Sequence, residues 1–221
     1  MNKFIESGFP NKKQEDWKFL DINQIIKKNI GELSFFNDNS LPNKIDPSIF
    51  VDGLEHNKII FINGRIEKID FNFEDQNKIE IIDETKKDIP FDYENSLIDL
   101  NSAFTDKVFK ILIKKNYSLK KPLIIYHTTD NKIQSTNINL RLDFELGENS
   151  CLKLIDYFSN NTAKNFINIF YNFNLEKNSI LKNYKIDKFR NNNLKYSFNN
   201  IEQGNNSVSE TFILSAGSDY F

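Results

Sequence analysis

The sequence predicts a mainly β protein built as a solenoid and preceded by a small helical region. From Lys107 onward, apolar and polar residues alternate with the period of a β-strand, and helical spacing is almost absent. A similar polar turn recurs between these strands at a nearly constant interval. In residues 1–30 the apolar residues are instead spaced loosely as in short helices, and Gly31 ends the last of them.

The clearest strand is predicted around residues 138–146. Its apolar residues, which alternate strictly with polar ones, are Ile138, Leu140, Leu142, Phe144 and Leu146. This alternation predicts one buried face and one face in contact with solvent. Residues 167–175 repeat the pattern, and Leu194, Tyr196 and Phe198 begin it a third time.

The turns after these strands form a repeat. They read ENSCL over residues 148–152, KNSIL over 177–181 and NNSVS over 205–209, and their serines are 29 and 28 residues apart. Two strands and two turns fill such a period, which is typical of one solenoid coil whose inward apolar side chains form a continuous column. An antiparallel sandwich with chance spacing is the alternative.

We divide the chain into two regions. Residues 1–95 are predicted to form an N-terminal helical cap with a short β-hairpin, and residues 96–221 to form the first coils of the solenoid. The hairpin is expected at Asn63-Gly64, because both central positions of a two-residue turn between β-prone runs require positive φ.

Composition excludes several classes of partner. Lys plus Arg number 29 and Asp plus Glu 31, so a net charge of −2 provides no long-range attraction for nucleic acid or an anionic membrane. No apolar run reaches the length of a membrane span, and residues 1–8 do not resemble a signal peptide. We therefore expect a cytoplasmic protein, and the single cysteine is consistent with a reducing compartment.

Four sequence blocks, in the right order, resemble one protein family. They are GFPNKKQEDWKF (8–19), FINGR (61–65), NSAFTD (101–106) and KKPLIIYH (120–127). Together they resemble the SufB/SufD family of the SUF iron–sulfur cluster assembly system, and the EDW opening and the Lys-Pro step favour the SufD type. The residues that carry the motifs are Gly8, Pro10, Glu15, Asp16, Trp17, Asn101, Ala103, Phe104 and Pro122.

The resemblance implies a right-handed parallel β-helix and a non-catalytic scaffold role. In this family SufD partners SufB and the SufC ABC-type ATPase in the SufBCD complex, and the wider complex handles ATP and the iron–sulfur cluster. The family's partner contacts lie in later coils and in a C-terminal helical domain that this sequence does not reach. We therefore expect a fragment with an uncovered apolar cross-section and an unpaired strand edge at its last coil.

Individual residues yield few candidate sites. Cys151 is a weak candidate for a thiolate metal ligand or a sulfur acceptor, and we interpret it as a small apolar residue in a coil. His56 and His127 lack a cysteine or carboxylate at ligand spacing, so we interpret both as structural. Glu15, Asp16 and Trp17 could form a recognition patch, but we favour Trp17 as an anchor of the helical cap.

No catalytic, cofactor-binding or metal-binding residue is assigned. The glycines are scattered, no phosphate-binding loop or hydrolase motif occurs, and acidic residues such as Asp143 and Glu145 are expected on the solvent face. We therefore predict that the chain is not an enzyme. A carbohydrate-active β-helix enzyme and a general solenoid interaction module are the alternatives.

Overall fold

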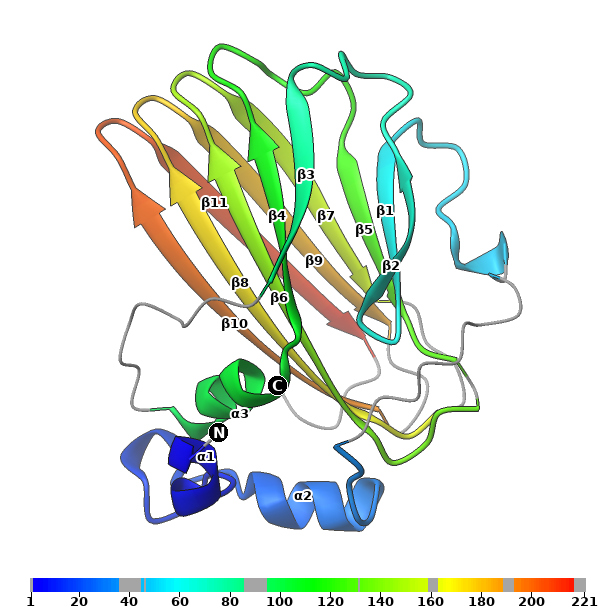
Figure 1. Ribbon diagram of the computed structural model, residues 1–221, viewed down its shortest axis with the longest axis vertical. Coiled ribbons are helices and arrows are strands. Elements are labelled where there is room, and N and C mark those ends of the chain that lie inside the picture. Colours follow the sequence, from blue (N-terminus) through cyan, green and yellow to red (C-terminus); the bar gives the residue numbers. More distant parts are fainter. Residues whose placement is uncertain are drawn as a thin grey trace.

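Two β-sheets face each other in the computed structural model, which describes residues 2–35, 45, 47–85, 95–130, 132–158, 163–188 and 193–216 (Figure 1). One sheet has the strand order β11-β9-β7-β5-β1-β2, and the other has the order β10-β8-β6-β4-β3. The strands are β1 (Asn57–Ile62), β2 (Arg65–Asp70), β3 (Ile79–Thr85), β4 (Lys107–Ile113), β5 (Leu123–Thr128), β6 (Asn137–Leu146), β7 (Cys151–Phe158), β8 (Phe166–Leu175), β9 (Ile180–Lys188), β10 (Leu194–Gln203) and β11 (Val208–Ala216). The helices are α1 (Asn2–Ser7), η1 (Glu15–Trp17), α2 (Ile22–Asn29), η2 (Pro47–Ile49) and α3 (Ser96–Phe104).

From β4 onward the chain crosses from one sheet to the other after every strand. Each strand pairs in parallel with the strand two positions later in the sequence, so β4 to β11 form a β-solenoid of about three turns. The main apolar core lies between the two sheets and receives side chains from both. The predicted mainly β solenoid with a small N-terminal helical region is confirmed, and the antiparallel sandwich is excluded.

The recurring turn has one backbone conformation. Asn149, Asn178 and Asn206 all have positive φ, with values of 57°, 57° and 58°. Asparagine tolerates this region better than most residues. The Nδ2 of Asn178 donates to Oδ1 of Asn149 over 2.9 Å, and Asn149 donates in the same way to Asn116. The repeat in the sequence is therefore a ladder of stacked amides, and Asn116 extends it by one coil.

The predicted hairpin joins β1 to β2. Asn63 and Gly64 have φ values of 53° and 78°, as a tight turn between antiparallel strands requires. On its other side β1 pairs in parallel with β5, so the hairpin continues a sheet of the solenoid.

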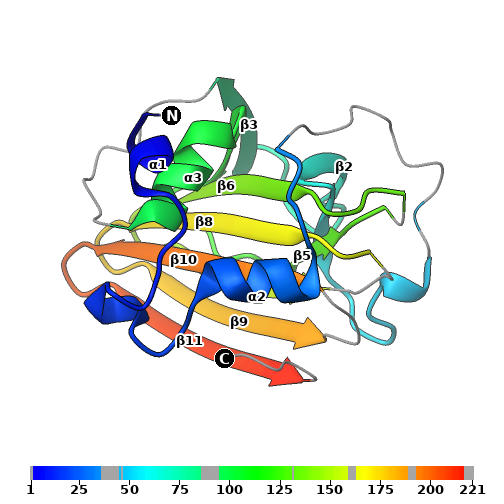
Figure 2. The ribbon, with the colours of Figure 1, turned by 90° about the horizontal axis from the view of Figure 1, so that it is seen from below.

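The helices α1, α2 and α3 gather at the end of the solenoid where β6, β8 and β10 begin (Figure 2). Gly8, with φ of +64°, follows α1, and its amide donates to the Phe4 carbonyl. The Trp17 ring lies 5.9 Å from the Tyr196 ring of β10 and packs in the apolar cluster between the helical region and the solenoid. No helix within the described ranges is long and apolar enough to cross a membrane.

The prediction of one solvent-exposed face on β6 and β8 is wrong for the first half of both strands. Asn139, Asn168 and Phe170 were expected in solvent, but all three are buried. Helix α3 lies over this face, and the Nδ2 of Asn101 donates to the carbonyl oxygens of Leu140 and Asn168. Covering by a segment distant in sequence buries polar residues that a strand pattern assigns to the surface.

The third alternating strand, β10, turns its polar face toward the interior of the solenoid. A continuous apolar column would require its apolar face there. Its register places Lys195, Ser197 and Asn199 beside three core residues of β8 and therefore inside the solenoid. Leu194 and Tyr196 point outward and pack with the helical region. The interior of the last coil is mostly polar, so the expected apolar cross-section is also wrong.

Candidate functional site

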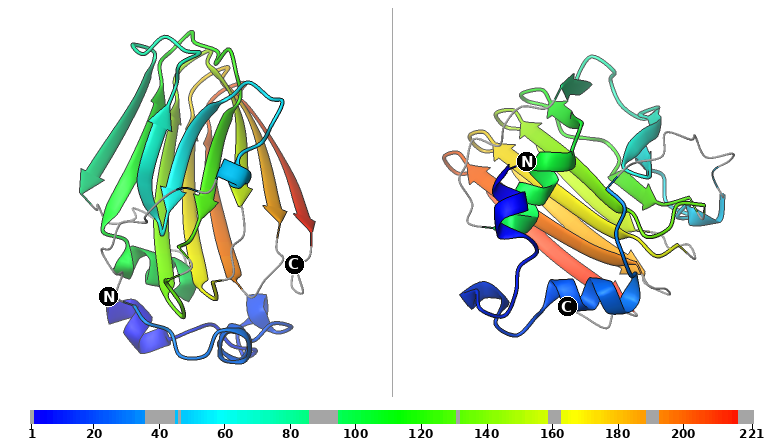
Figure 3. Two further views of the ribbon diagram at one scale, coloured as in Figure 1. Left: turned by 90° about the vertical axis from the view of Figure 1, so that its right-hand side faces the viewer. Right: turned by 60° about the horizontal axis from the view of Figure 1, so that its bottom comes forward.

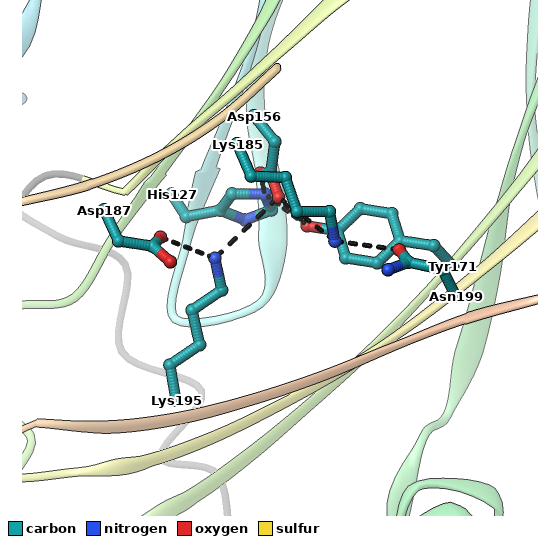
Figure 4. Close-up of polar contacts among 7 residues, drawn as sticks. All are labelled: His127, Asp156, Tyr171, Lys185, Asp187, Lys195 and Asn199. Atoms are coloured by element: carbon teal, nitrogen blue, oxygen red, sulfur yellow. Dashed lines mark hydrogen bonds and ion pairs between the residues drawn. The ribbon is translucent and has the colours of Figure 1, made fainter. Parts of the chain in front are cut away.

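A cluster of buried polar and charged side chains occupies the interior near the last coils (Figure 4). Its members come from five strands: His127 of β5, Asp156 of β7, Tyr171 of β8, Lys185 and Asp187 of β9, and Lys195 and Asn199 of β10. They sit at inward positions of the strand alternation. In β7, for example, Asp156 continues the buried series that begins with Leu152 and Leu154.

Asp156 is the centre of this cluster and is fully buried. The Nε2 of His127 lies 2.7 Å from its Oδ1, and the Tyr171 hydroxyl donates to its Oδ2 over 2.6 Å. The Nζ atoms of Lys185 and Lys195 lie 3.9 Å and 3.8 Å from the same Oδ2. A buried carboxylate is tolerated only with such compensation, so the position of Asp156 depends on all four neighbours.

These neighbours determine the ionisation of Asp156. Burial by itself would raise the pKa of Asp156, but the positive charges of Lys195 and Lys185 and the close approach of His127 hold that pKa well below its usual range. The same geometry acts in the opposite direction on the phenol. Burial and the negative charge of Asp156 raise the pKa of Tyr171 well above its usual value. Tyr171 therefore stays protonated and serves as a hydrogen-bond donor.

The two lysines have different environments. Burial lowers the pKa of Lys185 to about 8, in spite of the attraction of Asp156. Its Nζ donates to Oδ1 of Asn199 over 2.8 Å and lies 3.9 Å from the centre of the Tyr171 ring. Lys195 instead forms an ion pair with Asp187, at 2.7 Å. Lys185 can therefore lose its charge in mildly alkaline solution.

The chemistry open to this cluster is limited by access. A carboxylate beside a histidine is a common way to orient a general base. The His127 side chain, however, is only 5% exposed, and its Nε2 lies against the buried Oδ1 of Asp156. The cavity beside it has a volume of about 10 Å³ and is walled by Phe61, Phe158 and other apolar residues. That space holds one water molecule at most and no substrate, so the arrangement is an electrostatic element of the core.

The structure separates the residues that the sequence singled out. Cys151 is a free, partly exposed cysteine at the turn end of β7, where it pairs with Ile180. Within the part of the chain that the structure describes, no group of three His, Cys, Asp or Glu residues could hold a metal ion. His56 lies in a loop, and its Nε2 is 2.9 Å from the Tyr126 hydroxyl. Of the residues singled out from the sequence, His127, which we interpreted as structural, belongs to the buried cluster.

The motif residues lie outside the cluster and support the framework. Pro10 is buried, whereas Glu15 and Asp16 are exposed on η1. Asn101, Ala103 and Phe104 belong to the second half of α3, where the Phe104 ring lies 5.0 Å from Phe35. Pro122 precedes β5, and its carbonyl accepts a hydrogen bond from the Asn57 amide.

The cluster itself was missed in the sequence. One signal was present: Asp156 occupies an inward position of an otherwise apolar alternation, where a charged residue needs partners. No comparable signal marks Lys185 or Lys195.

The chain matches no protein-family model and no curated protein sequence. The sequence blocks and the structure therefore carry the functional argument.

Proposed function

We propose that this chain is a non-catalytic scaffold subunit of a cytoplasmic iron–sulfur cluster assembly complex, with a SufB-like subunit and a SufC-like ABC ATPase as its partners. The observation that carries the proposal is the coincidence of the four SufD-like blocks with structural junctions of a β-solenoid. Each block lies where one part of the chain is joined to the next.

The first and third blocks attach the helical region to the solenoid. Trp17 packs against Tyr196 of β10, and Asn101 binds carbonyl groups of β6 and β8. The second block forms the turn between β1 and β2, and the fourth leads into β5, the strand that pairs with β1. Motifs with this distribution maintain a framework, as expected for a scaffold.

The buried cluster supports a non-catalytic role. A carbohydrate-active β-helix enzyme needs acidic and basic side chains together on an accessible face. The cluster that this chain offers lies inside the solenoid, where Asp156 has no exposed surface and the adjoining cavity admits no sugar. In the proposed role this chain binds neither the iron–sulfur cluster nor ATP. Both are bound by its partners.

An affinity purification tests the proposal. The tagged full-length product of this gene is purified from its native cells under reducing conditions, and co-purifying proteins are identified by mass spectrometry. A SufB-like protein and an ABC ATPase are expected together, in stoichiometric amounts. Recovery of neither partner by the folded wild-type protein would refute the proposal.

A further inference from the structure

An apolar band crosses the outer face of the sheet that contains β1, β5, β7, β9 and β11. Strand register aligns its side chains in two adjacent rows. The first row is Ile124, Ile155, Tyr184 and Phe212; the second is Ile60, Tyr126, Tyr157, Ile186 and Leu214. Cross-strand neighbours in a sheet are about 5 Å apart, so these side chains form one continuous surface.

The first part of this band is covered by a segment of the chain itself. Ile45, Phe50 and Val51 pack on the buried residues of β1 and β5. The Phe50 ring meets Tyr126 edge-on at 5.2 Å, and the Val51 amide donates to the Tyr126 hydroxyl over 3.1 Å. Figure 3 shows η2, which contains Pro47, beside this sheet. The segment that covers the band is short and presents one aromatic ring.

The last part of the same band is bare. Tyr184, Phe212 and Leu214 are 38%, 57% and 50% exposed. The strand that carries two of them, β11, is the last strand of its sheet. Contiguous apolar surface of this kind marks sites of protein interaction. The bare part has the same chemistry as the covered part, and within the described ranges it lacks only a covering segment.

Charges beside the band indicate what the missing segment carries. In the adjacent row of the sheet, exposed Lys153 pairs with Lys182, which forms an ion pair with Glu210 at 3.2 Å. At the covered part, Lys58 lies 5.5 Å from the centre of the Phe50 ring and pairs with Asp70 at 3.6 Å, and Asp52 follows Val51. At the bare part, Lys153 forms no ion pair with any described residue, so an acidic residue next to an aromatic one is complementary to it.

We propose that the bare part of the band, Tyr184, Ile186, Phe212 and Leu214, binds a short segment of a partner protein in which a phenylalanine and aliphatic residues are followed by an acidic residue. The segment at residues 47–52 is the template for this partner because it already binds the first part of the same band. The inference does not depend on the proposed role in cluster assembly.

A labelled peptide provides the test. The peptide Ile-Asp-Pro-Ser-Ile-Phe-Val-Asp, which repeats residues 45–52, is titrated with the protein and followed by fluorescence anisotropy. We expect saturable binding that Phe212→Ser weakens by about tenfold, as does replacement of the peptide's phenylalanine by alanine. Lys182→Glu should weaken it as well. The control is Phe19→Ser, which removes a ring that is 88% exposed in the helical region and should leave binding unchanged.

Three outcomes would overturn the proposal. One is the absence of saturable binding up to about 1 mM peptide. Another is equal binding by Phe212→Ser, which would place the peptide at the covered part of the band after displacement of residues 45–52. The third comes from sedimentation: a wild-type dimer that Phe212→Ser converts to a monomer, without peptide binding, would identify a second copy of this chain as the occupant. Melting curves establish that each variant is folded.

Discussion

The hydroxyl of Tyr171 donates to Oδ2 of Asp156 across 2.6 Å, between two strands that belong to opposite sheets of the solenoid. This contact ties the two sheets together through a charge-assisted hydrogen bond, in a coil where apolar packing gives way to polar side chains. Such bonds are about twice as strong as neutral ones. The stability of the last coils therefore depends on Asp156 and on its protonation state.

Asp156→Asn tests this dependence. The substitution keeps the size of the side chain but leaves Lys185 and Lys195 without their shared anion, and loss of one partner of a buried ion pair costs about 3–5 kcal/mol. Urea unfolding should show a loss of that order in the free energy of unfolding. Tyr171→Phe should cost about 1.5–3 kcal/mol, since it removes only the hydrogen bond. Glu15→Gln, on the exposed η1, is the control, and a similar small effect of all three would contradict this account.

Because the pKa of Lys185 is lowered in the folded protein, we expect stability to rise at alkaline pH. Burial, as the main cause, lowers the pKa of Lys185 to about 8 from 10.5 in the unfolded chain. Between these two values the unfolded state binds more protons than the folded state, so the free energy of unfolding increases with pH. The expected gain is about 3 kcal/mol from pH 8 to pH 10.5. Lys185→Met should abolish it, and an equal slope in both proteins would exclude Lys185 as its source.

Because the pKa of Glu74 is lowered in the folded protein, we expect a loss of stability at acidic pH. Burial would raise the pKa of Glu74, but the hydroxyl of Tyr117, the amide of Asn57 and two backbone N–H groups donate to it and lower that pKa overall. The carboxylate is therefore stabilising above its unfolded pKa, and this contribution is lost as the pH falls through the folded value. Glu74→Gln should cost about 2 kcal/mol at pH 7. The difference from wild type should disappear at low pH, and a constant difference would argue for a packing effect instead.

Asn101 tests how α3 is attached. Its Nδ2 donates to two carbonyl groups of the sheet, and its Oδ1 accepts from Thr105. Asn101→Ala leaves buried groups unpaired and should destabilise the protein by about 2–3 kcal/mol. Ser102→Ala, on the next position of the same helix, is the control. Faster amide hydrogen exchange across α3 should accompany the loss, and unchanged exchange would contradict an attachment role.

The asparagine ladder separates backbone conformation from side-chain bonding. Asn178 combines a φ of 57° with a hydrogen bond to Asn149. Asn178→Ala loses both advantages and should cost about 2 kcal/mol, because alanine is strained in the left-handed region. Asn178→Gly keeps the conformation and loses only the bond, so it should cost about half as much. Thermal unfolding of the two variants measures the difference. The melting temperature should be lowest for Asn178→Ala, intermediate for Asn178→Gly and highest for wild type, and any other order would contradict this account.

Local sequence patterns are enough to predict the solenoid, its corner asparagines and the Asn63-Gly64 turn. These features depend on local properties: the alternation of side chains along one strand, and the φ angles that asparagine and glycine accept. A period close to 28 residues adds the stacking of coils without any knowledge of contacts.

Contacts between distant parts of the folded chain determine which face of β10 points inward and which polar residues are buried. Alternation shows that a strand has two faces but not which of them meets the core, and here the helical region offers Leu194 and Tyr196 an apolar surface outside the solenoid. The cluster around Asp156 has the same origin. Its members are up to 72 residues apart in the sequence, from His127 to Asn199, and only the register of five strands brings them together.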